Sequence, residues 1–166
     1  MGPALANSDI NNDGLEDIFI GAANGFSPKL YLQNKEGKFY SINSNYWSKQ
    51  SSFEDVDAIF VDVDNDGNQD LYVVSGGNEY EDKNINYADR IYINDGNGNF
   101  SRGKITGLIP ESGSVVKASD YDNDGDMDLF VGGRHIPHQY PLPATSKILR
   151  NDCLLYTSDA ADELRS

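Results

Sequence analysis

Three short loops in this chain place an oxygen-bearing side chain at nearly every second position. Each follows the pattern Asp-x-Asp/Asn-x-Asp-Gly-x-x-Asp and leads directly into an apolar stretch, and the copies span residues 9–17, 62–70 and 120–128. Calcium takes about six to eight oxygen ligands from carboxylates, amides, backbone carbonyls and water. A glycine stands at the sixth position of every copy, where a residue without Cβ can turn the backbone sharply. The spacing therefore predicts calcium-binding loops, with about one ion per repeat.

The first, third, fifth and ninth positions of each loop would supply side-chain oxygens, and the seventh its backbone carbonyl. The predicted ligands are Asp9, Asn11, Asp13, Leu15 and Asp17 in the first loop, Asp62, Asp64, Asp66, Asn68 and Asp70 in the second, and Asp120, Asp122, Asp124, Asp126 and Asp128 in the third. The uncharged amide in the first loop predicts a somewhat weaker site there. Without a cation the clustered carboxylates would repel one another strongly, so acidic turns with no metal role are the less favoured interpretation.

The EF-hand is the obvious rival, because it opens with the same spacing. It requires a bidentate Glu at loop position 12 and a helix on either side. Position 12 is Ile20, Val73 or Val131 in this chain, and β-branched and aromatic residues surround it. Such runs favour strands, so we exclude the EF-hand.

The loops belong to a repeat of about fifty residues, because their first aspartates stand at positions 9, 62 and 120. Other landmarks recur in phase: an apolar stretch before each loop, a strand after it, and a third strand followed by a glycine turn. Strands are expected at 4–6, 18–21, 29–33 and from Phe39 in the first unit, at 58–61, 71–76, 90–94 and from Phe100 in the second, and at 115–118, 129–133 and 147–150 in the third. Four strands per unit are typical of a propeller blade. The predicted fold class is all-β, with blades of four antiparallel strands; a β-sandwich would not need equivalent units in phase.

The repeat also resembles a known family. The three Asp loops and the run Ile-Tyr-Ile-Asn-Asp-Gly-Asn-Gly-Asn-Phe at 91–100 resemble the FG-GAP or VCBS repeats of integrin α-subunit propellers and bacterial surface proteins. Residues 73–80 are similar to extracellular VCBS proteins related to cartilage acidic protein. The resemblance covers residues 1 to about 152. It implies a calcium-binding β-propeller, commonly of seven blades, that acts in adhesion or ligand binding outside the cytoplasm.

The chain divides into units of unequal completeness. We expect residues 1–50 to form one blade, 51–110 a second, and 111–152 part of a third. The run from Cys153 to Glu163 resembles an in-frame translation of a transposase-type sequencing adapter, so 153–166 is interpreted as an artefactual tail and left out of the fold prediction. The chain begins directly inside the first expected strand, so the lack of a signal segment carries little information. We expect an internal fragment of a longer secreted protein. The missing propeller blades would then be its partners in the same chain.

The composition fits metal chemistry better than a basic partner. The net charge is −14, and twelve aspartates lie inside the three loops. Nucleic acid is not expected, because it requires a basic surface, and no stretch approaches the roughly 18 apolar residues of a membrane span. The single cysteine, Cys153, lies in the tail, so no disulfide framework is predicted. Calcium sites of extracellular modules bind at about 10⁻⁴–10⁻³ M, which indicates an extracellular, cell-surface or periplasmic location.

A ligand is expected on the face opposite the Asp loops, where a propeller carries the connections between second and third strands. These are residues 22–28, 77–89 and 134–145, and they hold the candidates Asn78, Glu79, Tyr80, Glu81, Tyr87, Arg134, His135, His138 and Tyr140. Aromatic and polar residues suit protein or glycan recognition. No catalytic triad, phosphate loop or isolated carboxylate pair is evident, and two loop histidines are weak evidence of a metal or catalytic pair, so an enzyme is not supported. The alternative is the propeller scaffold of a secreted carbohydrate-active enzyme.

Overall fold

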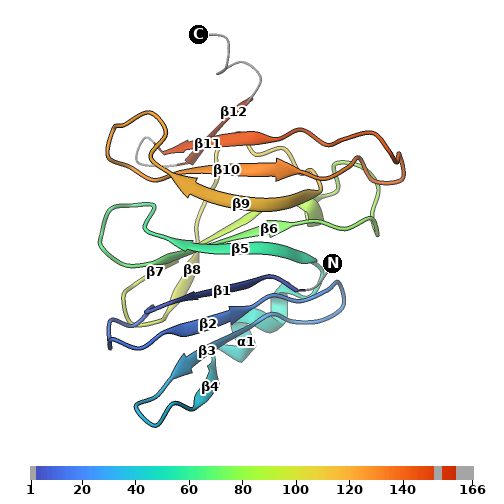
Figure 1. The fold of residues 1–166 in the computed structure, drawn as a ribbon. Coiled ribbons are helices and arrows are strands. Elements are labelled where there is room, and N and C mark those ends of the chain that lie inside the picture. The colour runs from blue at the N-terminus through green and yellow to red at the C-terminus, as the bar shows by residue number, and fades with distance from the viewer. Residues whose placement is uncertain (1–2, 152–154, 160–166) are drawn as a thin grey trace.

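The computed structural model describes residues 3–151 and 155–159, which form three four-stranded antiparallel sheets (Figure 1). In each sheet the strands lie side by side in the order of the sequence. The first sheet contains β1 (Leu5–Ser8), β2 (Asp17–Ile20), β3 (Lys29–Gln33) and β4 (Phe39–Ile42). The second contains β5 (Asp55–Val61), β6 (Asp70–Ser75), β7 (Arg90–Asn94) and β8 (Phe100–Arg102), and the third β9 (Gly113–Ser119), β10 (Asp128–Gly133), β11 (Lys147–Asn151) and β12 (Leu155–Asp159). The predicted all-β class with four-stranded, propeller-like blades is confirmed.

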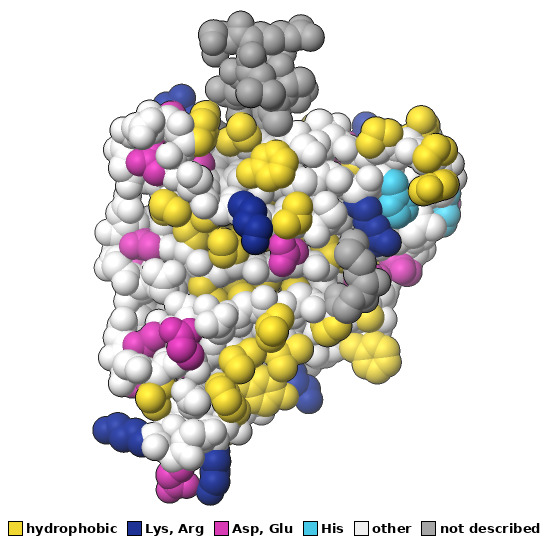
Figure 2. All heavy atoms as spheres, viewed as in Figure 1, with side chains coloured by type: hydrophobic (Ala, Val, Ile, Leu, Met, Phe, Trp, Pro, Cys, Tyr) yellow, Lys and Arg dark blue, Asp and Glu magenta, His cyan; other side chains and the backbone are white. Residues whose placement is uncertain are grey.

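The sheets stack one upon another, so that equivalent hairpins share a side of the molecule. The β1–β2, β5–β6 and β9–β10 hairpins emerge on one side, and the connections from second to third strands emerge on the other (Figure 1). The Asp loops are the first of these hairpins. Acidic side chains accordingly gather along that edge, whereas the histidines lie at the opposite one (Figure 2).

The hydrophobic cores lie between the sheets. Side chains on neighbouring strand positions point to opposite faces, so Leu71 of β6 faces the first sheet and Tyr72 faces the third. The first core joins Phe19, Leu30 and Leu32 to Leu71, Val73 and Tyr92, and the second joins Tyr72, Val74 and Ile91 to Val116, Leu129, Val131 and Leu149. Every residue of β6 is buried, because this strand lies between both cores.

A short helical connection between the first and second sheets was not predicted. It consists of α1 (Ser44–Trp47) and the 3₁₀ turn η1 (Ser48–Gln50). Trp47 is 1% exposed and fills the space between the two sheets, with its ring centroid 5.6 Å from that of Phe19 and 5.0 Å from that of Tyr92. A further 3₁₀ turn, η2 (Ile85–Tyr87), lies between β6 and β7. No helix in the described residues is long and apolar enough to cross a membrane.

The third sheet has a fourth strand in the segment that the sequence analysis left out. Strand β12 pairs with β11 along its whole length, from Lys147 opposite Asp159 to Asn151 opposite Leu155. Strand addition to a sheet edge relies on main-chain hydrogen bonds, so a segment without proline can join the edge whatever its origin. The artefactual origin of 153–166 stays a prediction, and residues 153, 154 and 160–166 of that region lie outside the described part.

Candidate metal-binding loops

The three Asp loops have the same backbone conformation. In each, the first aspartate accepts a hydrogen bond from the N–H of the sixth-position glycine, at 2.8 Å in the first loop, 2.9 Å in the second and 3.2 Å in the third. The φ angles of these glycines, Gly14, Gly67 and Gly125, are +84°, +87° and +100°. A Cβ would meet no atom within 4 Å at any of them, so the turn requires glycine for its left-handed backbone and not for space.

The fifth and seventh positions form a second shared element. The N–H of the seventh residue donates to Oδ1 of the fifth aspartate, at 2.9 Å from Leu15, 2.8 Å from Asn68 and 2.9 Å from Asp126. The seventh residue is the predicted donor of a backbone carbonyl to the ion. These contacts hold the fifth and seventh residues of each loop side by side, and the ninth residue is the first of the following strand. The ligand role itself stays a prediction.

The ninth-position aspartate does more than the sequence predicted, because it fastens each loop to its own sheet. In the second loop, Asp70 accepts hydrogen bonds from the N–H of Val63 at 3.1 Å and of Asn94 at 2.8 Å. The equivalent donors are Ile10 and Gln33 for Asp17, and Tyr121 and Asn151 for Asp128. All three aspartates are buried. A repeated donor pair of this kind links the loop to the end of the third strand.

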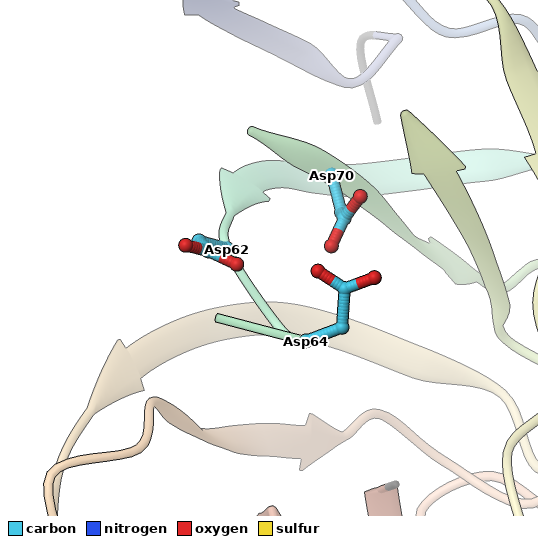
Figure 3. A group of neighbouring side chains, drawn as sticks. All are labelled: Asp62, Asp64 and Asp70. Carbon is cyan, nitrogen blue, oxygen red and sulfur yellow. The ribbon is translucent and has the colours of Figure 1, made fainter. Parts of the chain in front are cut away.

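Carboxylate oxygens converge in two of the loops. Single oxygens of Asp62, Asp64 and Asp70 lie within 4.8 Å of one another, and so do single oxygens of Asp120, Asp122 and Asp124. In the second loop the carboxylates of Asp64 and Asp70 face each other and Asp62 lies to one side (Figure 3). Among the described residues no Lys or Arg forms an ion pair with Asp62, Asp64 or Asp70. In the third loop, by contrast, Arg150 Nε lies 3.2 Å from Asp122 Oδ2.

The electrostatics of the second loop suit a bound cation. Burial, and then the nearby Asp64 and Asp66, raise the pKa of Asp70 to about 6, against two backbone hydrogen bonds that lower it. Burial and the charge of Asp66 also raise the pKa of Asp64. Oδ1 of Asp62 is buried and has no hydrogen-bond partner among the described residues. A donor set made only of hard oxygens, with one buried oxygen unpartnered, fits calcium or magnesium.

A comparison with protein families agrees with this geometry. The profile of the FG-GAP-like repeat matches residues 9–73 and 62–131, which together cover more than half of the chain. The chain belongs to the FG-GAP-like repeat family. Each match starts at the first aspartate of one loop and ends in the strand after the next, so that a match takes in two successive FG-GAP loops. FG-GAP repeats occur in β-propeller and adhesion-type modules that are typically extracellular. A comparison with curated proteins found no match.

On the face opposite the FG-GAP loops, one predicted recognition residue is structural. Tyr87 is fully buried, so the prediction that it faces a ligand is wrong. Its hydroxyl donates to the carbonyl of Tyr80 at 2.8 Å and accepts from the N–H of Tyr80 at 2.9 Å. The ring is buried because it braces the loop 77–89 from inside. Tyr80 in turn accepts from Asn24 Nδ2 at 2.7 Å, which ties this loop to the first sheet.

The two histidines support a neighbouring loop. His135 Nε2 lies 3.3 Å from Asn78 Oδ1, and the same oxygen accepts from the backbone N–H of His138 at 2.8 Å. Asn78 belongs to the second sheet's loop and the histidines to the third's. The His135 side chain and the His138 backbone thus link the third FG-GAP unit to the second. Tyr140, 87% exposed, is the most open aromatic residue of the predicted set.

Two carboxylates that sequence reasoning did not pair meet on this face. Glu54 and Glu79 converge over Gly77, whose φ is +110° and where a Cβ would collide with Glu79 Oε2. Burial, and then the charge of Glu79 and a hydrogen bond to it, raise the pKa of Glu54. Glu54 also lines a hollow of about 330 Å³ beside Phe26, which is 71% exposed. Only the folded loops bring these residues together.

Proposed function

We propose that this FG-GAP chain is a calcium-stabilised β-propeller module that acts outside the cytoplasm. The supporting observation is the second loop, where converging carboxylates include a buried oxygen without a hydrogen-bond partner among the described residues. The side chains of Asp62, Asp64, Asp66 and Asp70, with the carbonyl of Asn68, would hold the ion there. A bound cation relieves the carboxylate repulsion, so calcium stabilises the hairpin and performs no chemistry.

Calcium is expected to raise the melting temperature of the chain, and chelation to lower it. At about ten times the dissociation constant, each site contributes about 1.4 kcal/mol. A chain of this size gains about 2–4 °C per kcal/mol. The measurement is thermal unfolding followed by circular dichroism, in chelator, in millimolar calcium and in millimolar magnesium.

Loop variants separate specific binding from general screening of charge. Asp64→Asn should reduce the calcium-dependent rise in melting temperature, whereas Glu36→Gln, on an exposed turn outside the Asp loops, should leave it unchanged. An equal loss in both variants would mean that the ion acts only by screening. If calcium does not change the melting temperature of the unaltered chain, the site assignment is wrong.

We also propose that the opposite face binds a glycan. The hollow beside Phe26 combines an exposed aromatic ring with the carboxylate of Glu54. Binding pockets of this kind hold a ligand against apolar surface and orient it with a few polar groups. A sugar ring can stack on Phe26 while its hydroxyl groups donate to Glu54. Loops mounted on a rigid scaffold are common places for such sites.

Binding of the labelled chain to a panel of immobilised glycans in calcium tests this proposal. Phe26→Ala should lower the signal at least about tenfold, because the apolar wall of the hollow is lost. Tyr40→Ala is the matched control, since it removes an aromatic ring that is 50% exposed on β4, outside the predicted recognition loops. Equal binding by Phe26→Ala and the unaltered chain would contradict the assignment. Binding to a protein but to no glycan would replace it with protein recognition, and release of sugar products would favour the scaffold of a carbohydrate-active enzyme.

A further inference from the structure

The fourth residue of each Asp loop is an asparagine with a left-handed backbone. The φ angles are +59° at Asn12, +59° at Asn65 and +61° at Asn123. Among residues other than glycine, asparagine is one of the few that adopt this conformation readily. Asn12 and Asn65 do not donate to their own loops through the side-chain amide; they reach the neighbouring sheet.

Two of these asparagines connect successive loops. Asn12 Nδ2 donates to Asn68 Oδ1 at 3.1 Å and to the carbonyl of Gly96 at 3.3 Å. Asn65 Nδ2 donates to Asp126 Oδ1 at 2.5 Å. Both side-chain acceptors, Asn68 and Asp126, occupy the seventh position of the next loop. The third asparagine, Asn123, lies in the last Asp loop of residues 3–151, so this part of the chain holds no following loop for it to contact.

We propose that these asparagines couple calcium binding in adjacent loops. The inference rests on the proposed calcium function. The seventh residue is the predicted carbonyl ligand, and its N–H already donates to the fifth aspartate of its own loop. An ion that fixes this residue also fixes the acceptor used by the preceding loop's asparagine. The preceding loop then needs less ordering to bind its own ion, and the effect is reciprocal because both sites bias the same hydrogen-bonded element.

The expected coupling is modest, because the asparagines are exposed and each link consists of one or two hydrogen bonds. Hydrogen bonds of this kind correspond to a change in affinity of about threefold to tenfold per link. The acceptor in the second link is a carboxylate, and charge-assisted hydrogen bonds are the stronger ones. We therefore expect the coupling between the second and third loops to exceed that between the first and second.

Nuclear magnetic resonance can follow each loop separately, through the amides of Gly14, Gly67 and Gly125 during a calcium titration. Asn65→Gly removes the donor and keeps a residue that tolerates the left-handed backbone. We expect the calcium midpoint of Gly125, in the next loop, to rise about threefold to tenfold. Asn123→Gly is the matched control, with the same substitution at the same loop position, and should leave the midpoint of Gly67 unchanged.

A second pair of variants tests the link from its acceptor side. Asp126→Ala and Asp126→Asn both remove the charge, but only Asp126→Asn retains an oxygen that can accept from Asn65. The midpoint of Gly67 should therefore be higher in Asp126→Ala than in Asp126→Asn. Equal Gly67 midpoints in this pair, with an unchanged Gly125 midpoint in Asn65→Gly, would overturn the coupling and leave the calcium sites in place. Calcium-independent spectra of all three glycines in the unaltered chain would instead refute the proposed calcium function.

Discussion

Replacing Trp47 by alanine is expected to lower the free energy of unfolding by about 3–5 kcal/mol. The indole is 1% exposed and lies between the first and second sheets, in edge-to-face contact with Phe19, Tyr46 and Tyr92. Truncation removes apolar contacts and leaves a cavity that two rigid sheets cannot close. Urea unfolding measured by circular dichroism reports the change; fluorescence cannot, because Trp47 is the chain's single tryptophan.

Two further variants show whether the loss comes from this packing. Trp47→Phe should cost less than alanine, because it keeps an aromatic ring and because the indole N–H has no hydrogen-bond partner among the described residues. Tyr40→Ala removes an aromatic ring that is 50% exposed on β4 and should change stability by less than about 0.5 kcal/mol. A Trp47→Ala protein as stable as the Tyr40→Ala protein would show that the connection does not organise this core.

Replacing Asp55 by alanine is expected to lower the free energy of unfolding by about 3–5 kcal/mol, because a buried cation loses its partner. Asp55 Oδ1 pairs with Arg90 Nη2, and both side chains are almost fully buried. Asp55 Oδ2 accepts from the N–H of Ala22, in the β2–β3 connection of the first sheet, at 2.8 Å. The carboxylate thus pairs with β7 of its own sheet and also binds the neighbouring sheet. Urea unfolding at neutral pH measures the loss.

A double-mutant cycle isolates the charge pair. Arg90→Met should also destabilise, because it leaves Asp55 as a buried anion, and the double variant should lose less than the sum of the two single losses. Lys38→Ala breaks an exposed pair with Glu36, whose N–O distance is 3.0 Å, and should change stability by less than about 1 kcal/mol. Additive losses in the Asp55 and Arg90 variants would contradict a coupled buried pair.

The strands could be predicted because their signals are local. Alternating or continuous apolar residues, such as those at 18–20 and 71–74, and glycine turns mark each hairpin without knowledge of its neighbours. The helix that contains Trp47 could not be predicted, because its four residues are too few to show helical periodicity. The position of the indole is set by its contacts with Phe19 of the first sheet and Tyr92 of the second. Strand β12 differs for a related reason: an open edge recruits a strand through its backbone, which no sequence pattern records.

The same division holds for the candidate site. The loop composition is local, so the oxygen-bearing positions of all three loops follow from spacing alone. The second hydrogen bond of Asp70, to Asn94, joins residues 24 positions apart, and the link from Asn65 to Asp126 joins residues 61 positions apart. The burial of Tyr87 and the meeting of Glu54 with Glu79 depend equally on how sheets and loops stack. Contacts of this range are set by the fold and leave no spacing in the sequence.

The placement of the cores between the sheets has a consequence for how the molecule gains and loses order. In the described residues, three sheets share two cores, and no sheet has one to itself. The smallest cooperative unit is therefore a pair of sheets, and stability grows in steps, one interface at a time, as in a one-dimensional array with nearest-neighbour coupling. Within the described residues, the second sheet takes part in both interfaces, and the first and third sheets take part in one each. The strand β6, which lies between both cores, is therefore expected to be the last of these strands to open.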